Sequence, residues 1–185
     1  QPARQRLSAD QVPDGLSAND WSSLRAAREA DRRAAFAVDG GYAARNPGQQ
    51  WLTRFDGRGF TTQPDGGGWT WGLQLERYGF AGEERAVTEQ ALVSAAGERV
   101  SCDRDANLQE WYVNDSRGLE QGFTVRERPP QEAPGPLTFL LAVRGDLTPR
   151  VQDDGRGVRF VNSDGAAVLT YAGLKVLDAD GQVLA

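Results

Sequence analysis

The chain of 185 residues contains no histidine and no methionine, and it has a single cysteine. Without histidine, the chain cannot build a Ser-His-Asp or Cys-His catalytic set or a histidine-bound zinc site. A single cysteine excludes an internal disulfide, a thiolate zinc site and an iron–sulfur cluster held by this chain alone. These absences remove the commonest catalytic and metal-binding classes, and we expect neither a cofactor nor a metal.

Long hydrophobic runs and dense positive charge are also missing. No apolar run approaches the roughly 18 residues that a membrane-spanning helix needs. The formal net charge is −5, and the 21 basic residues form no patch dense enough for nucleic acid. We therefore expect neither a membrane span nor a nucleic-acid partner.

Residues 1–16 are polar and include Pro2, Pro13 and Gly15, which predicts an extended leader. The leader has no hydrophobic stretch, so it is not itself a signal peptide. Because the sequence also lacks an initiator methionine, a signal peptide could have been removed before Gln1.

Composition and length predict one domain. Hydrophobic residues make up 39% of the chain and charged residues 25%, which is typical of a globular protein. Residues 17–38 are the one convincing helix, with Ser17 as N-cap, Asp20 three residues later, and Gly40-Gly41 as a stop. Its apolar stripe is thin, so we expect it to lie on the surface of something larger, anchored by Trp21, Leu24 and Phe36.

From Trp51 onward the hydrophobic period changes to two, which is typical of strands. The clearest strand places Trp69, Trp71, Leu73 and Leu75 on one face. Short strands separated by turn sequences continue to the end of the chain. The spacing predicts a mainly β protein over residues 42–185, with one N-terminal helix before it. The strands form either one antiparallel β-sandwich or two packed β-subdomains.

A proline-rich segment interrupts the strands at residues 129–136. Four prolines in eight residues exclude regular structure there, and we interpret the segment as a long connection within one domain. The apolar run Leu137–Val143 that follows is typical of a strand covered on both faces. Asp-Gly pairs at Asp154, Asp164 and Asp180 then predict hairpin turns.

Aromatic residues suggest a carbohydrate site as an alternative to core packing. Trp69 and Trp71 share a face with leucines, which favours the core. Trp111 and Tyr112 are adjacent, so on a strand they face opposite sides and one of them could be exposed. These two residues are the candidate sugar platform.

Carboxylates cluster at Asp103, Asp105, Glu110, Asp115 and Glu120. Two positioned carboxylates can carry out glycoside hydrolysis. Glu110 and Glu120 lie on strands that flank one turn, so they could face each other across a hairpin. Each carboxylate also lies beside a turn or an arginine, where solvated charge is expected.

Two further features favour structural interpretations. Cys102 has an acidic neighbour and no histidine to activate it, so we interpret it as buried filler. Asp178-Ala179-Asp180-Gly181 is similar to the start of a calcium loop but lacks the glutamate that completes one, which favours a hairpin turn.

Several phrases occur together in the sequence: Asn46–Trp51, Phe55–Phe60, Trp69–Leu73, Leu108–Asp115, Gly118–Val125 and Tyr171–Val176. In this order they resemble the N-terminal region of large secreted bacterial proteins that continue into FG-GAP (integrin-α-like) or related β-propeller repeats. They are also similar to the uncharacterised domain that precedes SBBP-type propeller repeats. There an Asn-x-Gly-Gln start leads to a Leu-Glu-x-x-Phe strand, and the matching positions here are Asn46, Gly48, Gln49, Leu119, Glu120 and Phe123.

The resemblance spans about residues 40–185 and implies a secreted or cell-surface location with a non-catalytic role in adhesion or assembly. The implied partners are downstream repeat domains or other copies of the chain. The alternatives are a carbohydrate-binding module that uses exposed aromatics and a glycoside hydrolase that uses paired carboxylates. Trp111, Tyr112, Asp115, Glu110 and Glu120 are the candidate contact residues for a ligand, which could be a cell-surface glycan, or for a partner.

Overall fold

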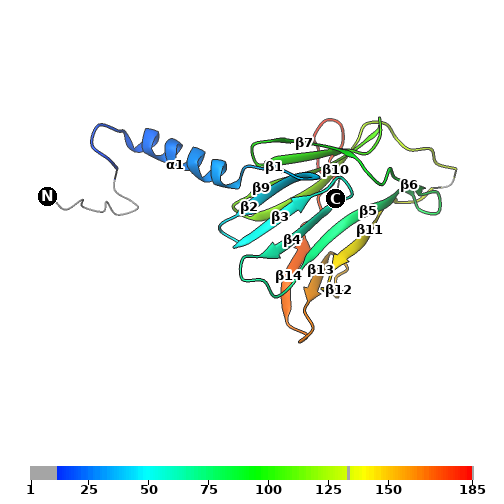
Figure 1. Ribbon diagram of the computed structural model, residues 1–185. Coiled ribbons are helices and arrows are strands. Elements are labelled where there is room, and N and C mark those ends of the chain that lie inside the picture. Colours follow the sequence, from blue (N-terminus) through cyan, green and yellow to red (C-terminus); the bar gives the residue numbers. More distant parts are fainter. Residues whose placement is uncertain (1–11, 133, 185) are drawn as a thin grey trace.

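The computed structural model describes residues 12–132 and 134–184 (Figure 1). Strands hold 49% of the residues and helix 9%. In the described residues the elements are α1 (Ala18–Arg33), β1 (Phe36–Val38), β2 (Gly41–Asn46), β3 (Trp51–Phe55), β4 (Phe60–Pro64), β5 (Trp71–Phe80), β6 (Arg85–Ala86), β7 (Leu92–Ala96), β8 (Arg99–Asp103), β9 (Leu108–Asp115), β10 (Gly118–Val125), β11 (Leu137–Gly145), β12 (Thr148–Val151), β13 (Gly157–Val161) and β14 (Ala167–Ala172). The predicted mainly β fold with one N-terminal helix is confirmed.

The strands form three antiparallel sheets. Sheet 1 has the order β1-β2-β3-β4-β5-β11, with β6 paired to one end of β5. Sheet 2 has the order β10-β9-β8-β7, and sheet 3 has the order β12-β13-β14. Most neighbours are joined by short turns, as the turn sequences predict, and β11 reaches β5 through the long connection that includes residues 129–136.

One hydrophobic core joins the three sheets. Phe55 and Phe60 of sheet 1 contact Tyr112 of sheet 2, with ring centroids 4.9 Å and 5.3 Å apart. Trp71 of sheet 1 contacts Phe160 of sheet 3 at 4.9 Å. Sheets 2 and 3 therefore pack against sheet 1, as in a sandwich whose second layer is divided. Trp71 is buried, as the alternation of apolar residues predicts.

Helix α1 begins as predicted and ends earlier than predicted. The Ser17 hydroxyl accepts a hydrogen bond from the Asp20 backbone N–H at 3.1 Å, which is an N-cap. The helix ends at Arg33, because the following residues are extended and β1 pairs with β2. Gly40 and Gly41 turn that hairpin instead of ending the helix. The predicted helix over residues 17–38 is therefore wrong in its last part.

The predicted anchoring of α1 by Leu24 and Phe36 is also wrong, whereas Trp21 is half-buried. Among the described residues, none in α1 is buried, and Leu24 is exposed. Phe36 lies in β1, where it too is exposed. Figure 1 shows that α1 projects away from the sheets, and Arg33 at its C-terminal end forms an ion pair with Glu98 of the β7–β8 turn. Within the described ranges, no helix has the length and apolar character needed to cross a bilayer.

Strand β11 differs from the expectation that both of its faces are covered. It is the last strand of sheet 1, and it pairs only with β5 among the described strands. Leu137, Leu140 and Val143 are 40%, 38% and 39% exposed. The apolar run correctly predicts a strand, but a continuous run does not say whether the strand is central or at an edge. The segment 129–136 contains no helix or strand in its described residues, as predicted.

Candidate functional site

The β9–β10 hairpin carries all five candidate residues. Burial alternates strictly along β9, so Glu110 and Tyr112 face the core while Trp111 faces outward. The register pairs Glu110 with Phe123 and Glu120 with Val113. Asp115 ends β9 beside the turn. The hairpin therefore divides the candidate residues between two faces of sheet 2.

Glu110 forms a fully buried ion pair with Arg104. The side chains of both residues are 0% exposed. One carboxylate oxygen of Glu110, Oε2, accepts hydrogen bonds from Arg104 Nε at 3.0 Å and Nη2 at 2.5 Å. Burial of a charge is costly unless it is paired and hydrogen-bonded, and this geometry meets both conditions.

The second oxygen of Glu110 is also occupied. Oε1 accepts from the Tyr112 hydroxyl at 2.6 Å and from Gln121 Nε2 at 2.7 Å. The Tyr171 hydroxyl of sheet 3 donates to Gln121 Oε1 at 3.3 Å. Burial and the neighbouring Glu110 charge hold the pKa of Tyr112 well above its usual value. The Glu110 carboxylate thus organises a polar network that joins sheets 2 and 3.

Arg104 extends the same network to sheet 1. Its Nη1 donates to the Gly57 carbonyl at 2.8 Å, and its Nη2 donates to the Arg58 carbonyl at 2.9 Å. Both carbonyls belong to the turn between β3 and β4. Nη1 also lies 3.4 Å from the Thr88 carbonyl. A single guanidinium therefore holds together backbone segments that are far apart in the sequence. The sequence does not single out Arg104 for this role, because it contains many arginines at similar turn positions.

Glu110 and Glu120 do not face each other across the hairpin, so that interpretation is wrong. Their positions are three pairs apart in the register, and an odd separation puts them on opposite faces of the sheet. Glu120 is exposed, and its Oε2 lies 3.3 Å from Arg117 Nη2. Such an exposed ion pair contributes little to stability.

Trp111 is half-buried and covered by its own sheet. Its ring lies over Gly122, where an added Cβ would come within 2.2 Å of the Trp111 Cζ2 atom. The Arg99 guanidinium carbon lies 4.4 Å from the ring centroid, which is a cation–π contact. Trp111 Nε1 donates to Thr124 Oγ1 at 3.2 Å. Trp111 and Tyr112 do face opposite sides, as predicted, but neither offers an unobstructed platform, and Tyr112 is fully buried.

Asp115 shapes the hairpin turn. Its carboxylate accepts from the Arg117 backbone N–H at 2.7 Å and from Arg117 Nη2 at 2.7 Å. Burial opposes ionisation here, but the hydrogen bonds and charge of Arg117 outweigh it and lower the pKa of Asp115. The contacts of Asp115 are those of a turn residue.

Two buried asparagines form a second network that sequence reasoning missed. Asn114 Nδ2 donates to the Arg33 carbonyl at 3.0 Å and to the Arg45 carbonyl at 2.9 Å. Asn46 Nδ2 donates to Asn114 Oδ1 at 2.9 Å, and Asn46 Oδ1 accepts from the Gln49 backbone N–H at 3.2 Å. These contacts attach the C-terminal end of α1 to both layers. The available signal was that Asn114 occupies an inward position in the alternation of β9.

The remaining candidate residues, Cys102 and Asp178, make contacts that stabilise the fold. Cys102 is fully buried, and burial together with the Glu110 charge raises the pKa of its thiol to about 12. Asp178 Oδ1 accepts from the Asp180 and Gln182 backbone N–H groups at 3.0 Å and 2.8 Å, which is a hairpin turn as predicted. In the described part of the chain, no cluster of acidic, cysteine or histidine side chains could hold a metal ion.

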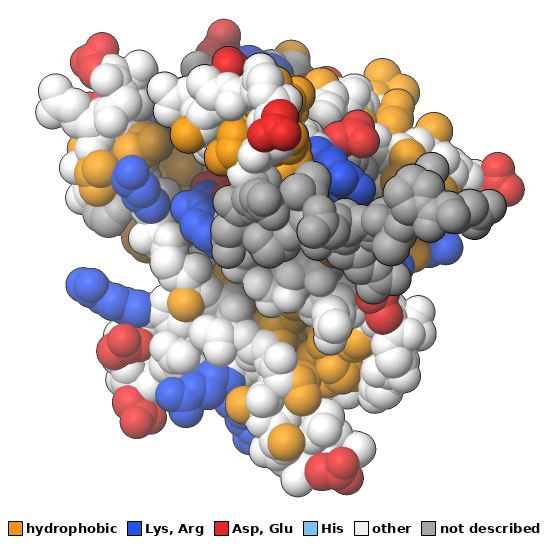
Figure 2. All heavy atoms as spheres, turned by 90° about the vertical axis from the view of Figure 1, so that its left-hand side faces the viewer, with side chains coloured by type: hydrophobic (Ala, Val, Ile, Leu, Met, Phe, Trp, Pro, Cys, Tyr) orange, Lys and Arg blue, Asp and Glu red, His pale blue; other side chains and the backbone are white. Residues whose placement is uncertain are grey.

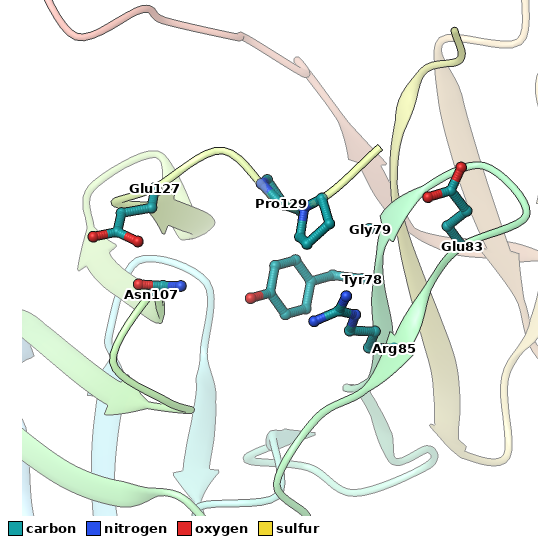
Figure 3. Close-up of a pocket in the computed structure, with 8 residues that line it drawn as sticks. Tyr78, Gly79, Glu83, Arg85, Asn107, Glu127 and Pro129 are labelled. Carbon is teal, nitrogen blue, oxygen red and sulfur yellow. The ribbon is translucent and has the colours of Figure 1, made fainter. Parts of the chain in front are cut away.

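Two small cavities lie outside the predicted site. The first has a volume of about 60 Å³ and lies between the end of β5 and the proline-rich connection. Figure 3 shows the Tyr78 ring between Pro129 and Arg85, with its hydroxyl directed to the side where Asn107 and Glu127 lie. Burial, followed by the charge and hydrogen bond of Asp105, raises the pKa of Tyr78.

The second cavity holds about 120 Å³ and lies where three turns meet. The chain before β5 contributes Trp69, the β11–β12 turn contributes Asp146, and the β13–β14 turn contributes Asn162 and Asp164. Asp146 Oδ1 accepts from the Thr70 backbone N–H at 2.6 Å, which fixes the carboxylate beside the ring. An aromatic face with amide and carboxylate groups is chemistry that suits a polar ligand with an apolar face.

The surface combines charged and apolar side chains. On the face shown in Figure 2, blue and red side chains are interspersed with orange ones. The most continuous stretch of exposed apolar residues in the described sequence lies after β14, at Leu174, Val176, Leu177, Val183 and Leu184. This segment, residues 173–184, is called the C-terminal hairpin below.

The chain matches no protein-family model, no curated protein and no solved structure.

Proposed function

We propose that the chain is a non-catalytic interaction module that acts in adhesion or assembly at a bacterial cell surface. The observation that carries this proposal is the C-terminal hairpin. The candidate polar residues of the β9–β10 hairpin support it indirectly, since Glu110, Tyr112 and Asp115 are engaged in contacts that hold the fold together. The secreted location rests on the resemblance to proteins with propeller repeats.

The C-terminal hairpin has an ordered backbone and exposed apolar side chains. Leu177 and Val183 form a β-bridge, and the Leu184 backbone N–H donates to the Val176 carbonyl at 2.8 Å. Leu174 is 84% exposed, and Leu184 is 66% exposed. A hairpin of two strands is marginal in water unless its side chains pack against something.

Burial of this hairpin against a partner gives a clear free-energy gain. Each fully buried leucine or valine side chain contributes about 1.5–3 kcal/mol. Five exposed apolar side chains on one ordered segment offer a partner apolar surface to cover. Repeat domains at the bacterial surface, which the resemblance implies as partners, would cover this surface.

The test is binding of the fluorescently labelled chain to envelope fractions of the source organism. We expect saturable binding that is lost when Leu174, Leu177 and Leu184 are all replaced by serine. The three side chains lie outside the core, so the melting temperature should not change. Leu92→Ser, at an exposed leucine of β7, is the matched surface control and should bind normally. Absence of binding, or equal binding by the triple variant, contradicts the proposal.

Carbohydrate binding is a second candidate, and the cavity at Trp69 favours it. The candidate sugar site is now formed by Trp69, Asp146 and Asn162, which line one cavity, and not by Trp111 and Tyr112. A sugar ring stacked on Trp69 would present its hydroxyls to the carboxylate and the amide. A glycan array tests this candidate. Binding that is lost in Asp146→Asn and retained in Glu120→Gln supports it, whereas an array without signal contradicts it.

A further inference from the structure

The outer edge of β11 is a long, apolar and unpaired strand edge. We propose that two copies of this chain associate through it, with the two β11 strands running antiparallel to form one continuous sheet. The inference deepens the proposed function, because it assigns one partner to the module. It rests on a different surface from the C-terminal hairpin.

The backbone of β11 is paired along one side only. Its nine residues pair with β5 through Leu137↔Phe80 to Gly145↔Trp71. Among the described residues, no strand pairs with its other side, and no turn or loop residue donates a backbone hydrogen bond to Thr138–Arg144. Alternate N–H and C=O groups of an edge strand point outward and form a template for another strand.

The side chains of β11 do not protect this edge. Proteins usually guard an exposed edge with proline, with lysine or other charged residues, with short strands or with a β-bulge in the edge strand. The register between β11 and β5 does shift between Leu140 and Leu141, but the extra residue is Glu76 of β5, so β11 itself carries no extra residue. Leu137–Val143 contains no charged residue and no proline. The neighbouring Arg144 is neutralised, because its Nη2 lies 2.7 Å from Asp56 Oδ2. By contrast, the edge strand β12 contains both Pro149 and Arg150.

The exposed apolar side chains of β11 are arranged symmetrically, and this favours a second copy as the occupant. Leu137 and Val143 each lie three residues from Leu140. A twofold axis through Leu140 would place it opposite its own copy and Leu137 opposite Val143 of the other chain. Opposed residues of an antiparallel pair lie on the same face. That condition is met, because Leu137 and Val143 pair with buried Phe80 and Leu73 of β5, and Leu140 pairs with exposed Arg77.

The pairing therefore covers Leu140 with its own copy on one face of the sheet, and Leu137 with Val143 of the other chain on the opposite face. A symmetric contact of this kind closes on itself and produces a dimer and no larger assembly. It also explains why the sequence of β11 is typical of a strand inside a sheet. In the dimer β11 would have a strand on each side.

Thiol cross-linking through Leu140→Cys tests the pairing directly. At a twofold axis the two introduced thiols would lie opposite each other, within reach of oxidation or of a short bis-maleimide linker. Cys102 does not interfere, because it is buried and the pKa of its thiol is raised to about 12. Leu92→Cys is the matched control, since Leu92 is an exposed leucine on the edge strand β7 of sheet 2.

We expect sedimentation to show a concentration-dependent dimer and Leu140→Cys to form a cross-linked dimer, whereas Leu92→Cys stays largely uncross-linked. Leu140→Lys should weaken the dimer about tenfold or more, because two like charges would meet at the axis. A monomer at all concentrations, equal cross-linking of the two cysteine variants, or a dimer unaffected by Leu140→Lys overturns the inference. Binding of Leu140→Lys to the envelope fraction distinguishes failure of the dimer inference from failure of the proposed function. If the chain is monomeric but still binds the envelope fraction, only the dimer inference fails.

Discussion

At the scale of single residues, the buried Arg104–Glu110 pair determines how the candidate site is understood. A carboxylate in a cavity, free to exchange a proton with a substrate, would be a candidate acid or base. Glu110 instead has both oxygens bonded to groups of the protein, and its partner Arg104 binds the carbonyls of the β3–β4 turn. We therefore interpret Glu110 as a residue that holds the sheets together.

Glu110→Gln should destabilise the protein strongly. The substitution keeps the shape of the side chain but leaves the buried Arg104 guanidinium without a countercharge, a loss of about 3–5 kcal/mol. Glu120→Gln should change the free energy of unfolding by less than about 0.5 kcal/mol, because Glu120 is exposed. Urea denaturation of both variants measures the difference. Equal midpoints would contradict a structural role for Glu110.

The thiol of Cys102 should be unreactive in the native protein. Because burial raises its pKa to about 12, the thiol stays protonated at all pH values well below that, and the reactive thiolate is scarce. A thiol reagent added near neutral pH should label the chain only after denaturation. Rapid labelling of the native protein would show that the β8 region opens far more easily than its burial implies.

At the scale of elements, α1 and the strands differ in what stabilises them. Strands such as β3, β5 and β9 have several buried side chains, whereas α1 has a good N-cap and no buried residue in the part of the chain that the structure describes. Isolated helices of this length are marginal in water. Its contacts with the sheets include Arg33, whose Nε donates to Glu98 Oε1 at 2.6 Å and whose carbonyl accepts from Asn114 Nδ2 at 3.0 Å.

Native-state hydrogen exchange should therefore separate α1 from the strands. We expect the amides in the middle of α1 to exchange orders of magnitude faster than those of β9, because local opening of the helix breaks few tertiary contacts. The comparison is made within one sample, so stability and pH are matched. Protection of α1 equal to that of β9 would show that a partner or another part of the chain covers the helix.

The sequence predicts the helix and the strands of this fold better than it predicts which of them pair with one another. Alternation identifies β9 and the apolar face of β5, and Ser17 identifies the start of α1. The end of α1 was missed because alanines favour helix locally, while pairing of β1 with β2 depends on a hairpin farther along. The exposed position of β11 was missed because sheet order is a non-local property.

The candidate site shows the same limit. Turn chemistry predicts that β9 and β10 pair, and alternation places Trp111 and Tyr112 on opposite faces. The register between β9 and β10 decides whether Glu110 and Glu120 meet, and a shift of one residue would reverse the answer. The partner of Glu110, Arg104, lies in a turn, where the sequence gives no sign of burial.

At the scale of the whole molecule, the three sheets share one core. Trp71 and Phe160 join sheets 1 and 3, and the Glu110 network reaches sheet 3 through Gln121 and Tyr171. Unfolding should therefore be a single cooperative transition.

Phe160→Ala should lower the stability of the entire chain by about 3–5 kcal/mol. Two separate transitions, with only one shifted by the substitution, would show that sheet 3 folds as an independent unit.

The interaction role is tested most directly by hydroxyl-radical footprinting of the C-terminal hairpin, with and without the envelope fraction that binds the chain. The account predicts that Leu174, Leu177 and Leu184 are readily oxidised in the free protein, where all three are exposed, and strongly protected in the bound protein. Exposed Leu92 is the internal reference and should react equally in both states. Unchanged oxidation of the hairpin upon binding, with protection elsewhere, would contradict the account.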